Sequence, residues 1–154
     1  LAFREGPAAI RALEKIKEAD LLLFDGHGIA HPRRMGIATH LGICFDKPSI
    51  GCAKSILTGR PYPGGKKNEK ILPVYDGKEK VGFALKIKEK GRPLFVSPGH
   101  LIDFETTLNI IPALLRGHKI PEPLRIAHIY ANRYKKEGKN GENKKNCSCL
   151  FRRT

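Results

Sequence analysis

A carboxylate, two glycines and two histidines lie close together in one segment, Asp25-Gly26-His27-Gly28-Ile29-Ala30-His31-Pro32. The apolar run just before it, Leu21-Leu22-Leu23-Phe24, predicts a buried strand, so Asp25 is expected at the carboxyl end of that strand. Open α/β sheets collect ligands and catalytic groups at this edge. The core holds a carboxylate there while leaving it open to solvent, and the glycines allow main-chain groups to approach a ligand.

A second carboxylate, Glu5, precedes Asp25 by twenty residues, with a helix expected between them. A helix followed by a strand can return the chain so that both carboxylates meet at one edge of the sheet. Two or three convergent carboxylates with open water positions form a Mg²⁺ site, which can activate water and neutralise a phosphate. The alternative is structural: Glu5 pairs with Arg4 or Arg34, and Asp25 caps the following turn.

The two histidines of this segment and a lysine further along the chain offer additional chemistry. His27 and His31 are four residues apart, but Gly28 and Pro32 exclude the helix on which such a pair binds zinc. Lys54 ends an apolar stretch, where it could reach a phosphate at the sheet edge. Its alternative role is to lay its stem along apolar surface with the ammonium in water.

Two later features are candidates as well. The turn Ser97-Pro98-Gly99-His100 exposes main-chain N–H groups and a histidine, which suits either an anion site or a plain strand-to-helix connection. His128 falls in an expected helix, where it reads equally well as a half-buried surface histidine.

The composition points to a polyanionic partner. The chain of 154 residues is long enough for one domain with a core, and 29 Lys and Arg against 15 Asp and Glu give a net charge of +14. A basic surface without such a partner is the alternative. The four cysteines form no C-x-x-C pair, and no signal peptide or long apolar run occurs. We therefore expect a cytoplasmic protein without membrane contact.

The hydrophobic periodicity predicts a mixed α/β domain, with helices covering a sheet. The expected elements are a helix from Gly6-Pro7 to about Ala19, a strand over 21–25, a short helix over 37–45, a strand over 49–53, a loop over 59–70, a hairpin turning at Asp76-Gly77, a strand over 94–96, a helix capped by Asp103 and kinked or ended at Pro112, and a last helix from Pro121 to about Tyr134.

Six segments, in order, resemble the motifs of the endonuclease V family and together span residues 1–134: Phe3-Arg4-Glu5-Gly6-Pro7, the segment 25–33, Gly36-Ile37-Ala38-Thr39-His40, Gly51-Cys52-Ala53-Lys54-Ser55, Val96-Ser97-Pro98-Gly99-His100 and the segment 121–128. The resemblance implies an RNase H-like mixed sheet flanked by helices. It also implies a Mg²⁺-dependent DNA-repair endonuclease, with Mn²⁺ as a substitute, that recognises deoxyinosine and cleaves the second phosphodiester bond on its 3′ side. The implied partner is deoxyinosine-containing DNA, with inosine-containing RNA as the alternative. We expect a monomer.

The resemblance also implies roles for individual residues. Glu5 and Asp25 match metal ligands, Lys54 matches a lysine near the scissile phosphate, and His128 matches a histidine near the metal. The base pocket is implied at Leu1, Gly26 and Ile37. Nucleic-acid contacts are implied at His31, Arg33, Ser97, Gly99 and His100.

The sequence departs from the family pattern in several places. The family's first catalytic Asp, on an earlier strand, and its P-Y-I-P wedge have no counterpart in these 154 residues, and Leu124 stands where Thr is usual. Tyr62, between Pro61 and Pro63, resembles the wedge superficially but lies at the wrong position. We therefore expect an N-terminally incomplete domain over 1–134 and a basic disordered tail over 135–154. The alternative function is a catalytically impaired chain that only binds inosine-containing or single-stranded nucleic acid.

Overall fold

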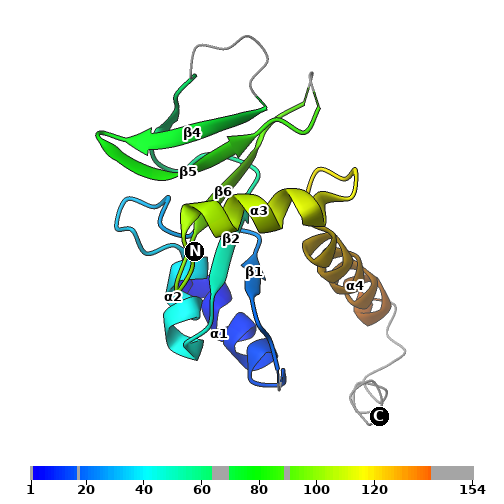
Figure 1. Cartoon of the computed structure of the whole chain (residues 1–154). Helices are drawn as coiled ribbons and strands as arrows, with labels where there is room; N and C mark the ends of the chain where they lie inside the picture. Colours follow the sequence, from blue (N-terminus) through cyan, green and yellow to red (C-terminus); the bar gives the residue numbers. More distant parts are fainter. Residues whose placement is uncertain (1, 17, 64–69, 89–90, 140–154) are drawn as a thin grey trace.

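Six strands form one mixed sheet in the computed structural model, which describes residues 2–16, 18–63, 70–88 and 91–139 (Figure 1). The order across the sheet is β1-β2-β6-β5-β4-β3. β1 and β2 run parallel, and every other neighbouring pair is antiparallel. The bounds are β1 Leu22–Phe24, β2 Ser49–Ala53, β3 Arg60–Pro61, β4 Ile71–Asp76, β5 Glu79–Leu85 and β6 Leu94–Pro98.

Four helices accompany the sheet: α1 Ala2–Leu13, α2 Ile37–Phe45, α3 Phe104–Leu115 and α4 Glu122–Lys139. In Figure 1, α3 crosses in front of β2 and β6, whereas α4 extends away from the sheet. α2 packs against β1 and β2, and α1 packs chiefly against α2. None of the helices in the described ranges is long and apolar enough to cross a membrane.

The main core lies between the sheet and α3. Ile50 and Cys52 of β2 pack there with Val96 of β6 and Ile111 of α3. Successive side chains of a strand point to opposite faces, so Gly51 and Ala53 of β2 face the other way. That second face receives the segment after β1, and the site is built on it.

The expected fold class is confirmed, and most expected elements are present. The hairpin turns at Gly77, whose φ of 64° suits glycine. Asp103 caps α3, since its carboxylate accepts a hydrogen bond from the N–H of Thr106 at 2.7 Å. The short β3 lies within the expected loop over 59–70.

Several boundaries differ from expectation. α1 begins at Ala2 and contains Pro7, which removes one main-chain hydrogen bond that packing can compensate. It ends at Leu13 and not near Ala19, since the N–H groups of Lys15 and Ile16 donate three residues back, to Ala12 and Leu13. Pro112 does not end α3, which continues to Leu115. α4 continues to Lys139, so the first five residues of the expected tail are helical. The remainder of that tail, 140–154, lies outside the described residues.

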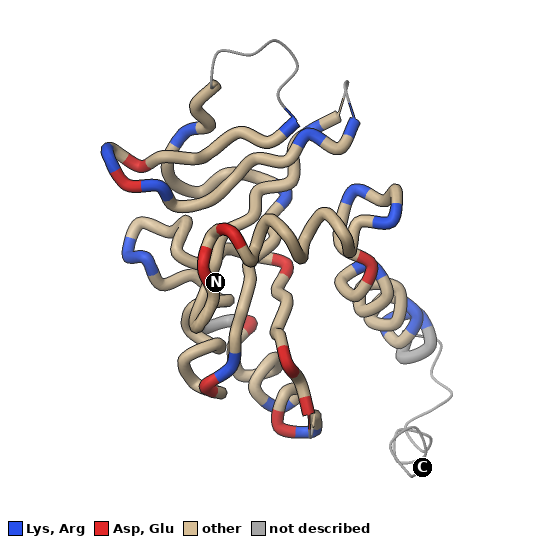
Figure 2. The backbone as a smooth tube through the Cα atoms, in the orientation of Figure 1, with Lys and Arg blue, Asp and Glu red and all other residues tan. Residues whose placement is uncertain are grey.

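The charged residues are unevenly placed along the chain. Figure 2 shows Lys and Arg along α4 and at the loops next to the β4–β5 hairpin, and Asp and Glu around the connection from α1 to β1.

Candidate functional site

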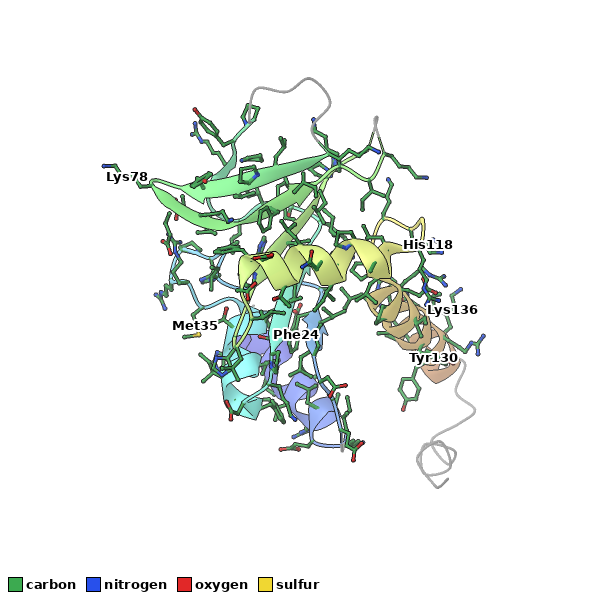
Figure 3. All side chains as sticks on the ribbon, in the orientation of Figure 1. Phe24, Met35, Lys78, His118, Tyr130 and Lys136 are labelled. Atoms are coloured by element: carbon green, nitrogen blue, oxygen red, sulfur yellow. The ribbon has the colours of Figure 1, made fainter. Side chains whose placement is uncertain are left out.

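A cavity of about 450 Å³ opens where β1 and β2 end. Three elements bring charged side chains to it: Glu5 comes from α1, Asp25 follows β1 and Lys54 follows β2. Met35, which also lines the cavity, is labelled in Figure 3. The described residues that line it are Glu5, Asp25, Gly26, His27, His31, Met35, Gly36, Ile37, Ala53, Lys54, Ser55 and Leu57.

Asp25 and Lys54 are in direct contact. The ammonium of Lys54 donates to Oδ2 of Asp25 at 2.7 Å, and both side chains are more than half exposed, at 59% and 51% for Lys54 and Asp25. Parallel pairing of β1 with β2 places the two strand ends side by side and so creates this contact. The carboxylate of Asp25 thus pairs with Lys54 and stays half exposed, accessible to a cation from solvent.

The turn after Asp25 is fastened to β2 and β6. The N–H of Gly26 donates to the carbonyls of Phe24 at 3.0 Å and Cys52 at 3.2 Å. The N–H of Gly28 donates to the buried hydroxyl of Ser97 at 2.8 Å. Because these main-chain donors are directed into the fold, the N–H groups of the two glycines are not available to a base in the cavity. The expectation that main-chain groups of this turn contact the base is therefore not supported for the N–H groups of Gly26 and Gly28.

Close backbone approach explains two of the glycines. A Cβ on Gly28 would lie 2.0 Å from the carbonyl oxygen of Pro98, and a Cβ on Gly51 would lie 2.4 Å from the nitrogen of Gly28. Since both obstacles are backbone atoms, no side-chain rotation could relieve them. The turn can lie flat on β2 and β6 only when these positions carry no side chain.

The chain then returns from the turn into α2. The carbonyl of His27 accepts from the N–H of Ala38 at 3.1 Å, and that of Gly28 accepts from the N–H of Gly36 at 3.0 Å. This return brings Ile37 against Gly26, so that a Cβ on Gly26 would lie 2.6 Å from Cγ2 of Ile37. The two residues expected to share a base pocket therefore are in contact at the cavity wall.

Two histidines line the same cavity in an environment that favours their neutral form. Burial lowers the pKa of His27, although a hydrogen bond to the backbone of Ser55 partly opposes this shift. Burial and the nearby Arg33 lower the pKa of His31. Both imidazoles are therefore uncharged near pH 7, and they add hydrogen-bonding capacity to the cavity without adding positive charge.

Comparison with known proteins identifies the family. The family model described as Endonuclease V matches residues 1–129. Endonuclease V of Methanothrix thermoacetophila is 55% identical over 130 residues, which make up 84% of this chain and 58% of that relative. The chain belongs to the Endonuclease V family.

Solved Endonuclease V structures agree with the fold described above. That of Streptomyces avermitilis has a TM-score of 0.79 at 37% identity, covering 90% of this chain and 61% of that one. That of Ciona intestinalis, in complex with a 24mer DNA containing an inosine followed by a ribo-adenosine, has a TM-score of 0.73 at 31% identity. It covers 89% of this chain and 65% of that one. The chain thus spans about three fifths of the length of the Endonuclease V proteins it matches.

The cavity brings together half of the residues that the Endonuclease V motifs singled out. Glu5, Asp25, Lys54, Gly26 and Ile37 all line it, together with His31. Arg33 is exposed in the same loop. Leu1 lies outside the described residues.

Other expected residues lie elsewhere. Ser97 is 1% exposed and its hydroxyl accepts from Gly28, so it holds the turn and is not placed to contact nucleic acid. Gly99 and His100 both bond to Ser49, the first residue of β2, whereas Lys54 follows the last. Neither residue lines the cavity, although a Cβ on Gly99 would lie only 3.0 Å from the carbonyl carbon of Ala38, the residue after Ile37.

His128 is an exposed residue of α4 and does not line the cavity. Arg34, one of the proposed partners of Glu5, instead pairs with Asp76 at 2.9 Å and with Glu79 at 2.6 Å. The side chain of Arg4 is outside what the structure describes. Glu5 is therefore not the ion-pair partner of Arg34.

The residues present suit a hard cation that keeps several waters. No group of three or more His, Cys, Asp or Glu that could hold a metal occurs within the described ranges. Glu5 and Asp25 nevertheless share one cavity, and Mg²⁺ is commonly held by one or two carboxylates together with phosphate oxygens of the substrate. The oxygen donors fit Mg²⁺ on chemical grounds.

Sequence reasoning missed the apolar part of the lining. Met35 and Leu57 are 42% and 54% exposed and border the cavity. The available signal was a large apolar residue inside a segment otherwise rich in glycine, proline and charge. Single exposed apolar residues are common on protein surfaces, so this signal does not by itself mark a binding role.

Proposed function

We propose that this chain carries the cation-binding and base-recognising centre of an endonuclease that acts on deoxyinosine in DNA, cleaving the second phosphodiester bond on the 3′ side. The observation that supports it most is the meeting of Glu5, Asp25 and Lys54 in one cavity with the Gly26–Ile37 contact in its wall. Charge for a phosphate and an apolar wall for a base thus occur together. The Ciona intestinalis relative was solved with inosine-containing DNA, which supports this substrate class.

In this proposal, Glu5 and Asp25 hold Mg²⁺, which supplies charge neutralisation at the phosphate and activates water when bound. Lys54 already lies beside Asp25, so its ammonium is placed to attract a phosphate oxygen at the same end of the sheet. The side chain of Ile37 limits the width of the base pocket at Gly26. The neutral histidines hydrogen-bond without competing with the cation.

The test is a nicking assay on an inosine-containing oligonucleotide, with and without Mg²⁺. Asp25→Ala should abolish cutting while leaving binding of the oligonucleotide largely intact, because Asp25 serves the cation and not the base. Asp46→Ala is the matched control, since Asp46 is an exposed aspartate that contacts His100 at the far end of β2. Cleavage by Asp25→Ala at the wild-type rate would contradict the assignment.

A second candidate function is binding without cutting. It is favoured by the number of carboxylates, because only Glu5 and Asp25 meet in the described part of the cavity. A wild-type chain that binds the inosine strand but fails to nick it over a full Mg²⁺ titration would favour this function over the first.

A further inference from the structure

A second concave site lies beside the candidate active site and is lined by two tyrosines and an arginine. Its volume is about 310 Å³, and its lining comprises Gly59, Arg60, Tyr62, Tyr75, Asp76 and Gly77. The rings of Tyr62 and Tyr75 are 6.4 Å apart between centroids and inclined at 83°. Because they meet edge to face, the edge of one ring lies against one face of the other, and this contact leaves the remaining ring faces uncovered for a planar ligand.

Tyr62 is exposed yet fixed in place. Its side chain is 67% exposed, which is unusual for a residue that is also well anchored. Its N–H donates to the carbonyl of Pro73 at 2.8 Å, and it stands between Pro61 and Pro63. Proline restricts both its own φ and the conformation of the residue before it, so this backbone is stiff. The backbone that carries the ring therefore loses little freedom when a partner binds.

The charge around the tyrosines favours an anionic ligand. Among the described residues that line the site, Asp76 is the only carboxylate; it pairs with Arg34 at 2.9 Å and accepts from the hydroxyl of Thr58 at 3.1 Å. Arg34 also pairs with Glu79. Arg60, by contrast, makes no ion pair within the described residues. Lys78 projects outward from the β4–β5 turn next to the site (Figure 3). The local excess is positive, as it is for the chain as a whole.

One short stretch of chain and one set of polar contacts place this site next to the cavity of Asp25. Leu57 lines that cavity and Gly59 lines the tyrosine site, and two residues span at most about 7 Å. Arg34 also joins the loop of His31 to the β4–β5 turn, since it donates to the carbonyl of His31 as well as pairing with Asp76. A polymer lying in one cavity reaches the other within a few monomer units.

We propose that Tyr62, Tyr75 and Arg60 form a stacking site for unpaired bases of the strand that flanks the inosine. The ligand class is single-stranded nucleic acid, whose bases stack on aromatic rings regardless of sequence while arginine attracts the backbone. This inference rests on the proposed function, because the strand is positioned by its inosine in the neighbouring cavity. It adds a sequence-independent contact that lies outside the cation site.

The experiment compares two inosine-containing single strands. One carries long stretches of flanking nucleotides, and the other is trimmed to the nucleotides next to the inosine. Tyr62→Ala should weaken binding of the long strand by about five-fold or more, as base–aromatic stacking typically does, and leave the short strand unchanged. Tyr62→Phe keeps the ring and should bind both strands like the wild type. Tyr130→Ala is the matched control, because Tyr130 is equally exposed, at 65%, but lies on α4 (Figure 3).

A direct readout accompanies the affinities. Strands carrying 5-iodouracil at one flanking position at a time are irradiated with the wild-type chain, and the adduct is mapped by mass spectrometry to peptides containing Tyr62 or Tyr75. Equal losses on both strands in Tyr62→Ala, or adducts only elsewhere, would overturn the stacking site while leaving the proposed function standing. If the wild type binds neither inosine strand, the proposed function fails and this inference fails with it.

Discussion

The contact between Gly26 and Ile37 allows a quantitative test of the cavity wall. An added Cβ at Gly26 would lie 2.6 Å from Cγ2 of Ile37 and 4.0 Å from its Cβ. Carbon atoms pack at about 3.5–4.0 Å, so Gly26→Ala forces a displacement of about 1 Å. Overpacking of this kind typically costs about 1–3 kcal/mol. The φ of Gly26 is not positive, so the cost arises from this contact and not from backbone strain.

A second substitution, at Ile37, should relieve the overpacking caused by Gly26→Ala. Ile37→Ala removes Cγ2 and leaves Cβ at 4.0 Å, which is ordinary contact. The double variant Gly26→Ala/Ile37→Ala should therefore be more stable than the sum of the two single effects predicts, by about 1–3 kcal/mol. Urea unfolding of the four proteins measures this coupling. Strict additivity would refute the contact as the cause.

The same variants test the base pocket. Gly26→Ala should weaken binding of an inosine-containing strand more than binding of the same strand with adenine, because the added methyl narrows the wall that faces the base. His27→Ala should preserve this selectivity, since the imidazole of His27 is partly buried and hydrogen-bonds to the backbone of Ser55. Loss of selectivity in His27→Ala alone would contradict the assignment of the pocket.

Three further outcomes are expected. Burial lowers the pKa of His27, so between that lowered value and 6.5 the unfolded state binds more protons than the folded state. The free energy of unfolding should therefore rise with pH through that window. In thermal unfolding at several pH values, His27→Asn should show a smaller rise of stability with pH. Asp103→Ala removes the cap of α3 and should lower the melting temperature by about 2–4 °C, whereas Asp103→Asn should retain most of it. Binding of single-stranded nucleic acid should weaken with salt at about −0.7 per neutralised phosphate on a log–log plot, and a flat response would exclude a polyanionic partner.

The sequence was sufficient to predict the elements that carry a strong local signal. The apolar run before Asp25 and the stretch ending at Lys54 predicted two core strands, each followed by a charged residue at the sheet edge, and both residues line the same cavity. Their parallel pairing became apparent only in the structure. Spacing of apolar residues likewise predicted α2. These patterns are local, and burial of one face is enough to fix them.

The rest depended on contacts between distant parts of the chain. Ser97 was expected at the surface because its neighbours Pro98 and Gly99 are typical of exposed turns. Its hydroxyl instead accepts from Gly28, which lies 69 residues away in sequence, and no local pattern reports such a partner. The extent of α1 differs from expectation for a related reason. Gly6-Pro7 is a local signal for a helix start, but α1 begins before it and packs against α2.

Glu5 lies on a helix whereas Asp25 follows a strand, and this difference has a consequence for local motion at the site. Asp25 sits at the end of a strand paired within the sheet, but Glu5 sits on α1, which packs chiefly against another helix and not against the sheet. Peripheral helices of this sort open in local fluctuations well below the energy of global unfolding. A cation bound by both carboxylates would therefore tie a labile segment to a stable one, so that the affinity for the cation includes the free energy of closing α1.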